Sequence, residues 1–284
     1  MREYIKKNSV ALFFTLTFMI SWSGILIITN QTGLPAAKEQ FDEWLPIAMI
    51  PYLLGPSIAG FIMIGLTKGK TEFSELFKKL MKWRLRSSTY LIALFVVPLL
   101  SVISLLILYQ FSKVYIPDII TADDKLTLIL SGLAYGIIGG GLFEELGWSG
   151  FATPKLREKY GVLKTGLIIG VFWGAWHFLP VFWGSGDRLG NLDVSIFLPG
   201  LFFHYAGLIP VRILIVWLYD KSLSLIPPII LHATLTTFTF FIFNISQLGI
   251  SLFIYYALLS IGFWIFVAFI IKRKPLLRLH KIIK

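Results

Sequence analysis

Long apolar runs follow one another along the chain, and short polar segments separate them. A helix needs about 20 apolar residues to cross the hydrocarbon core of a bilayer. The chain has eight runs of roughly this length, so we predict eight membrane-spanning helices. They are Ser9–Thr29, Trp44–Leu66, Thr89–Phe111, Leu126–Pro154, Thr165–Trp183, Ser195–Tyr219, Leu223–Phe243 and Gly249–Ile271. The fourth run is longer than one span requires, and we expect a loop or an interfacial turn at its outer end.

Composition indicates an all-α polytopic membrane protein rather than a soluble domain. Hydrophobic residues make up 56% of the 284 residues and charged residues only 14%, whereas soluble domains carry about 25% charged residues. Cysteine is absent, which rules out disulfide bonds and thiolate metal ligands. No repeat or domain boundary interrupts the pattern, so we predict a single integral membrane domain over residues 1–284.

The basic residues indicate how the spans are oriented. With a cytoplasmic N-terminus, 21 of the 26 Lys and Arg residues fall in cytoplasmic segments and four in the outer loops, which hold eight acidic residues. This asymmetry follows the positive-inside rule, so we predict that both termini are cytoplasmic and that the first span is an uncleaved anchor. Topology accounts for the charge of +11, and we expect a lipid partner and no nucleic acid. The lysine-rich loops favour a bacterial plasma membrane, while no pattern indicates an oligomeric state.

Two further segments are amphipathic rather than spanning, and the second is the short basic tail after Ile271. The residues from Thr71 to Arg86 carry apolar side chains at helical spacing with lysines between them. The apolar positions are Phe73, Leu76, Phe77, Leu80 and Trp83. This pattern predicts a helix lying on anionic lipid, and a helix that binds a partner protein is the alternative.

The stretch Gly139–Leu156 carries the candidate chemistry. Glu144 and Glu145 are adjacent there, with apolar sequence on both sides. A carboxylate in lipid is costly unless it is protonated, paired or bound to a metal, so the pair is a functional-site hypothesis. Adjacent helical residues point about 100° apart, so the two carboxylates cannot face one water. Ser149 lies on the helix face of Glu145.

Four more polar side chains lie inside predicted spans: His177, His204, Arg212 and His232. At about 1.5 Å of rise per residue, Glu144 and His177 lie roughly 15–18 Å from the cytoplasmic edge and His232 roughly 14 Å. A glutamate and two histidines at one depth suit a general base with imidazoles that orient its water, or a zinc site with an open position. A polar cluster that only holds helices together is the third interpretation. His204 lies nearer the outer side, where we expect a satisfied polar contact.

Three motifs resemble those of the CPBP family of intramembrane proteases, also called the type II CAAX-prenyl endopeptidase or Abi family. The family's Glu-Glu-x-x-x-Arg motif, with a small-aromatic run and Pro-x-Leu, corresponds to Glu144-Glu145-Leu-Gly-Trp-Ser149-Gly-Phe151 and Pro154-Lys-Leu156. Its Phe-x-x-x-His motif, usually continued by Leu-Pro, corresponds to Trp173-Gly-Ala-Trp-His177-Phe-Leu-Pro180. Its His-x-x-x-Asn/Asp motif corresponds to His232-Ala-Thr-Leu-Thr236. The resemblance covers residues 126–236, the predicted protease-like core.

The resemblance implies a glutamate-dependent intramembrane endopeptidase whose site is sunk in the bilayer. Glu144 would be the general base that activates water, His177 would share that water, and His232 would stabilise the oxyanion or position the water. Family members are often called metalloproteases, and zinc, if bound, would be held by the same three residues. The family's activities imply a hydrophobic peptide or a protein C-terminus, with or without a prenyl group, as the substrate.

Three positions depart from the family's pattern. Ser149 replaces the arginine that pairs with Glu145, and we expect either a protonated Glu145 bonded to Ser149 or a pairing with Arg212 from the sixth span. Trp173 replaces phenylalanine and keeps an aromatic wall. Thr236 replaces asparagine or aspartate, and its hydroxyl is shorter and offers no amide donor.

Two other classes of function remain beside the enzyme. The departures at Ser149 and Thr236 favour a non-catalytic membrane scaffold or a bacteriocin-immunity protein of the same fold. Because Glu and His inside membranes also relay protons, a proton-coupled transporter is the second alternative. A transporter would carry proton flux and inverted repeats, and the sequence contains no repeat.

Overall fold

Helices form every regular element of the computed structural model, which describes residues 2–67 and 69–273. The first half of the bundle consists of α2 (Ser9–Thr32), α3 (Lys38–Thr67), α5 (Ser87–Tyr109), α7 (Lys125–Ala134), η2 (Tyr135–Glu144), α8 (Glu145–Gly147), η3 (Trp148–Ala152) and α9 (Thr153–Arg157). The second half consists of α10 (Val162–Trp176), α11 (Phe178–Trp183), α12 (Val194–Ala206), α13 (Leu208–Ser222), α14 (Ile226–Thr237), η4 (Phe238–Ile242) and α15 (Ile250–Arg273). Short helices at the two ends are α1 (Arg2–Lys7), α4 (Lys70–Leu80), η1 (Lys113–Tyr115) and α6 (Asp118–Thr121).

Within the described residues, seven helices or helix runs are long and apolar enough to cross a membrane. They correspond to seven of the predicted spans, and the eighth is the shorter apolar run Ile226–Ile242. This helix begins at Ile226 because Pro227 and Pro228 fit the first helical turn, which needs no backbone N–H. The predicted all-α, polytopic bundle of about eight spans is confirmed.

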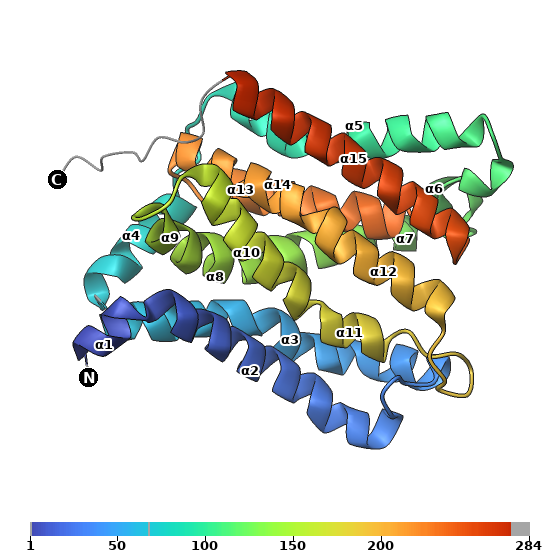
Figure 1. Ribbon diagram of the computed structural model, residues 1–284, viewed down its shortest axis with the longest axis horizontal. Coiled ribbons are helices and arrows are strands. Elements are labelled where there is room, and N and C mark those ends of the chain that lie inside the picture. Colours follow the sequence, from blue (N-terminus) through green and yellow to red (C-terminus); the bar gives the residue numbers. More distant parts are fainter. Residues whose placement is uncertain (1, 68, 274–284) are drawn as a thin grey trace.

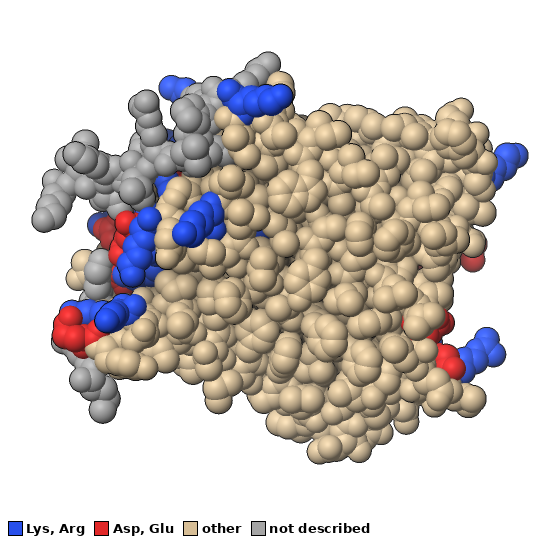
Figure 2. Space-filling view, in the orientation of Figure 1, with Lys and Arg blue, Asp and Glu red and all other residues tan. Residues whose placement is uncertain are grey.

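On the face shown in Figure 2, the charged side chains at the surface lie at the two ends of the bundle. Lys and Arg gather at the end where α1, α4 and the C-terminal part of α15 lie (Figure 1). At the other end, the Asp187 carboxylate accepts the backbone N–H groups of Asn191 and Leu189, and these hydrogen bonds lower the pKa of Asp187. The distribution agrees with the predicted orientation. From residue 274 onward, the basic tail expected beyond Ile271 lies outside the described residues.

The fourth span runs from Lys125 to Arg157 without the loop or turn that we expected at its outer end. Asp124 caps this run by accepting the backbone N–H of Thr127 at 3.0 Å. Its segments η2 and η3 are wound as π-helix. A π-helical turn holds more residues than an α-helical turn. A run of 33 residues is therefore shorter than a pure α-helix of that length, which lets it fit as one span.

Prolines lie inside several spans, and side chains of another helix bond two of the carbonyls that these prolines leave free. A proline has no N–H for the carbonyl four residues before it. Pro56 frees the carbonyl of Tyr52, which accepts from Ser21 Oγ at 2.8 Å. Pro180 likewise frees Trp176, whose carbonyl accepts from Trp22 Nε1 at 3.0 Å. Irregular backbone is tolerated in a membrane where such partners exist, and the break near Pro180 separates α10 from α11.

The amphipathic helix is shorter than predicted and is docked against the protein. α4 ends at Leu80 rather than Arg86. The helix stops there because groups in the connection between α13 and α14 donate hydrogen bonds to its C-terminal backbone carbonyls. The Lys79 carbonyl accepts the Leu225 N–H at 3.1 Å and the Ser224 hydroxyl at 3.3 Å. Of the predicted apolar positions, Leu76 is buried and Phe77 and Trp83 are exposed. Contact of these two side chains with lipid stays a prediction.

Tight packing of α3 against the fourth span sets the position of the glutamate pair. A side chain at Gly147 would bring its Cβ within 2.2 Å of the Pro56 carbonyl oxygen. The Ser57 hydroxyl donates to the carbonyl of Phe143. The backbones of α3 and the fourth span are therefore in contact at Gly147, about one helical turn after Glu144.

We expect Gly147→Ala to lower the stability of the detergent-solubilised protein by about 1–3 kcal/mol, because overpacking forces α3 away. Gly65→Ala is the matched control, since nothing lies within 4 Å of a Cβ at that position. Thermal unfolding should show the control unchanged or slightly stabilised. Equal midpoints for the two variants would contradict the close contact at Gly147.

Candidate active site

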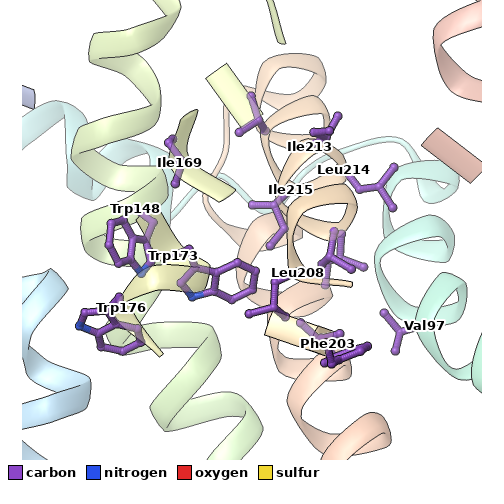
Figure 3. Packing of buried hydrophobic residues seen from close by; sticks show 14 of the residues in the cluster. Val97, Trp148, Ile169, Trp173, Trp176, Phe203, Leu208, Ile213, Leu214 and Ile215 are labelled. Carbon is purple, nitrogen blue, oxygen red and sulfur yellow. The ribbon is translucent and has the colours of Figure 1, made fainter. Parts of the chain in front are cut away.

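Glu144 lies at the end of η2 and is buried. Its Oε2 accepts hydrogen bonds from Trp173 Nε1 at 2.8 Å and from Trp148 Nε1 at 3.3 Å. Its Oε1 lies 3.9 Å from His232 Nε2, too far for a direct hydrogen bond. Figure 3 shows the two indoles close together, with Trp176 beside them. The indoles fix one carboxylate oxygen and leave the other facing the imidazole.

Glu145 is fully buried and has a different set of partners. Arg212 Nη1 donates to Oε1 at 2.8 Å and to Oε2 at 3.0 Å. The Ser149 hydroxyl also donates to Oε2. The Arg212 guanidinium stacks over the Trp173 ring at 4.0 Å from its centroid. Of the two alternatives expected for Glu145, the pairing with Arg212 is formed, and the Ser149 hydroxyl bonds the same carboxylate. An arginine from α13 thus takes the place of the one missing at position 149.

His232 connects the two glutamates. Its Nδ1 lies 2.7 Å from Glu145 Oε1, and a paired carboxylate there is an acceptor, so Nδ1 carries the hydrogen. Nε2 is left facing Glu144. The backbone at Gly140 packs closely against His232 and Thr236. A Cβ at Gly140 would lie 2.7 Å from Thr236 Oγ1 and 2.9 Å from His232 Nε2, so only glycine fits there. The structure thus places the Thr236 hydroxyl and the free imidazole nitrogen against the same backbone segment.

His177 lies at the break between α10 and α11. Its Nδ1 lies 2.8 Å from the Trp173 carbonyl oxygen, which can only accept, so Nε2 of the neutral ring carries a lone pair. The ring meets Trp173 edge to face, with 5.6 Å between centroids, and Trp173 meets His232 in the same way at 4.9 Å. Trp173 therefore contacts both imidazoles and bonds Glu144.

The structure adds two residues to this group that the sequence did not predict there. The His204 ring lies 4.6 Å from that of His177, although its Nδ1 bond to the Gly200 carbonyl at 2.6 Å is the satisfied contact that we expected. Tyr52 of α3 approaches His177 from the other side, with 6.3 Å between ring centroids. Neither residue lies in a motif, and only the prolines around Tyr52 mark its turn as irregular.

A metal centre is not formed by these side chains as the structure places them. Across residues 2–67 and 69–273, no three His, Asp or Glu side chains come together closely enough to hold a metal ion. Zinc held by Glu144, His177 and His232 stays a prediction.

Two comparisons show what the chain is similar to. Residues 125–238 match the model of a family described as type II CAAX prenyl endopeptidase Rce1-like. A protein named CAAX prenyl protease 2, from Methanococcus maripaludis, is 24% identical over 243 residues, which cover 85% of this chain and 84% of that protein. The chain is therefore similar to the Rce1-like family over residues 125–238.

The Rce1-like family supports an intramembrane endopeptidase that acts on a peptide, and the apolar helices make the chain a multi-pass membrane protein. The matched range contains all candidate residues from Glu144 to Thr236, whereas α2 and α3 with Tyr52 lie outside it. The Abi assignment, metal dependence and a bacterial source stay predictions.

We expect Arg212→Met to destabilise the fold by about 3–5 kcal/mol, because it leaves the Glu145 charge buried without its partner. Adding Glu145→Gln should recover most of the loss, since both charges are then removed. Thermal unfolding in detergent measures both effects.

Lys155→Met is the matched control, because it breaks the more accessible Lys155–Glu72 pair at the cytoplasmic end. This change should cost about 1 kcal/mol or less. A loss at Arg212 no larger than the loss at Lys155 would show that the buried pair is not required.

Proposed function

We propose that this Rce1-like protein is an intramembrane endopeptidase in which Glu144 activates a water that hydrolyses a peptide bond. The observation that carries the proposal is the asymmetry of the Glu144 carboxylate. Two indole N–H groups hold Oε2, while Oε1 faces His232 Nε2 across 3.9 Å. A general base needs one oxygen free for the proton it removes and a fixed orientation toward the water. Glu144 meets both conditions.

His177 is proposed to share the water with Glu144. Its Nδ1–H is engaged by the Trp173 carbonyl, so its Nε2 lone pair is available to accept one hydrogen of the water. Glu144 Oε1 accepts the other hydrogen. With both hydrogens bound, a lone pair on the water oxygen can be aimed at the substrate carbonyl carbon.

His232 and Thr236 are proposed to stabilise the oxyanion. His232 donates Nδ1–H to Glu145, and in its doubly protonated form its Nε2–H is a second donor. The Thr236 hydroxyl lies against the same segment at Gly140 and can donate to the same oxygen. Donors held in place before charge develops are the most effective form of such stabilisation. A hydroxyl here takes over the donor role of the family's asparagine.

The reaction follows from these positions. Glu144 Oε1 removes a proton as the water oxygen bonds to the carbonyl carbon, and the negative charge moves to the carbonyl oxygen beside His232 and Thr236. The protonated Glu144 then gives its proton to the amide nitrogen, and the C–N bond breaks. The products are a peptide with a new carboxylate, a peptide with a free amine, and the regenerated carboxylate of Glu144.

The surroundings of the site support a hydrophobic substrate. An apolar groove of about 260 Å³ lies between α3 and the fourth span and reaches Gly139 and Phe143, just before Glu144. The relative's name, CAAX prenyl protease 2, suggests a C-terminal peptide that carries a prenyl group. We propose that such a peptide, with or without that group, enters from the lipid at a bacterial plasma membrane.

The two alternative functions, a scaffold or immunity protein and a proton-coupled transporter, predict different experimental results. A scaffold or immunity protein does not require the free Oε1 of Glu144, and its biological effect would survive Glu144→Gln. A proton-coupled transporter would carry protons across liposomes. The Rce1-like match favours the protease over both.

We expect the purified protein in nanodiscs to cleave members of a pool of hydrophobic and farnesylated C-terminal peptides. Glu144→Gln and His177→Ala should each lower kcat by about 10²-fold or more, because each removes a group that binds the reacting water. Mass spectrometry of the products measures cleavage, and a chelator arm tests metal dependence.

Glu75→Gln is the matched control for this assay, since Glu75 pairs with Lys78 on the exposed face of α4. It should cleave at the wild-type rate. Absence of cleavage by a well-folded wild type across the whole pool would favour the scaffold.

We expect Thr236→Val, which keeps the shape and removes the hydroxyl, to lower kcat by about 10-fold to 10²-fold. Thr236→Ser should keep most of the activity and Thr236→Asn should equal or exceed the wild type. The same peptide assay measures all three. Full activity in the valine variant would exclude an oxyanion donor at this position.

A further inference from the structure

Tyr52 of α3 lies beside His177, one of the proposed ligands of the water. It is 3% exposed, and its ring stacks on that of Trp176 with 3.9 Å between centroids and 11° between planes. The same ring meets His177 at 73°. Because Trp176 covers one face of the phenol, the side chain has little freedom to turn away from His177.

The backbone around Tyr52 is also held in place. Its carbonyl, freed by Pro56, accepts from Ser21 of α2. Leu53 packs against Gly139, where a Cβ would lie 3.0 Å from Leu53 Cδ1. This turn of α3 therefore runs beside the segment that ends at Glu144.

The Tyr52 hydroxyl has no hydrogen-bond partner among the described residues, although it is buried. A buried hydroxyl without a partner is uncommon in proteins, and each case needs an explanation. The Tyr52 ring lies beside that of His177, on the turn of α3 that runs along the segment ending at Glu144. The proposed water between Glu144 and His177 is a candidate partner for this hydroxyl.

We propose that the Tyr52 hydroxyl is a third ligand of the hydrolytic water and therefore a catalytic residue. The inference rests on the proposed function, and it adds a residue from outside the range that matches the family. In the proposed site, the hydrogens of the water are bound by Glu144 and His177. The phenol O–H donates to one lone pair of the water oxygen, which leaves the other lone pair directed at the substrate carbonyl.

This arrangement requires a protonated phenol during turnover. The donor disappears when the phenol ionises, so activity falls as the pH rises through the pKa of that phenol. A more acidic phenol at position 52 should move this fall to lower pH, whereas a tyrosine with a purely structural role would not affect it.

The test compares wild type, Tyr52→Phe and Glu144→Gln in the nanodisc peptide assay. Tyr52→Phe keeps the ring on Trp176 and should lower kcat tenfold or more with KM within twofold of wild type. Tyr255→Phe is the matched control, because Tyr255 is fully buried in α15, and it should leave kcat unchanged. In a second measurement, 3,5-difluorotyrosine is incorporated at position 52 or 255, which keeps both ring and hydroxyl should Tyr52→Phe fail to fold.

The outcomes separate the two proposals. Substitution with difluorotyrosine at position 52, and not at 255, should shift the alkaline fall of kcat to lower pH by at least one unit. If Tyr52→Phe cleaves at the wild-type rate while Glu144→Gln is inactive, or if the pH profile does not move, the role of Tyr52 is wrong and the endopeptidase stands. If Glu144→Gln cleaves like wild type, the proposed mechanism falls and the role of Tyr52 falls with it.

Discussion

The buried ion pair between Arg212 and Glu145 is the interaction on which the rest of the site depends. Both side chains are fully buried in a part of the bundle that would lie within the membrane, where an unpaired charge is very costly. The guanidinium satisfies both carboxylate oxygens and stacks on Trp173. Because Glu145 is paired, its carboxylate can accept Nδ1–H of His232, and this bond fixes which imidazole nitrogen faces Glu144.

Helix geometry then separates two neighbouring carboxylates into two roles. Side chains one residue apart point about 100° apart on a helix, so Glu145 reaches α13 while Glu144 reaches the indoles of Trp148 and Trp173. Glu145 accepts four hydrogen bonds, two from Arg212 and one each from Ser149 and His232, so its role is structural. Glu144 has partners on one oxygen only, and the environment rather than the residue type makes it the candidate base.

The length of the apolar runs was enough to predict the spans. The missing arginine at position 149 left two alternatives for Glu145, of which the pairing with Arg212 is formed. Features that depend on contacts between distant segments could not be predicted in this way. The end of α4 is set by Ser224 and Leu225 from another connection, and Tyr52 reaches the site through the packing of α3 on the fourth span. The residues near Leu80 and Tyr52 in the sequence form no pattern that predicts these contacts.

Single-turnover hydrolysis in ¹⁸O-labelled water tests most directly whether Glu144 activates a water or attacks the substrate itself. Unlabelled protein in nanodiscs would be mixed with a slight deficit of a cleavable peptide, and the product and the peptide containing Glu144 would be weighed by mass spectrometry. A general base predicts one ¹⁸O in the new product carboxylate in the first turnover and none in Glu144. Label in the Glu144 carboxylate, with an unlabelled first product, would show a covalent intermediate and contradict the account.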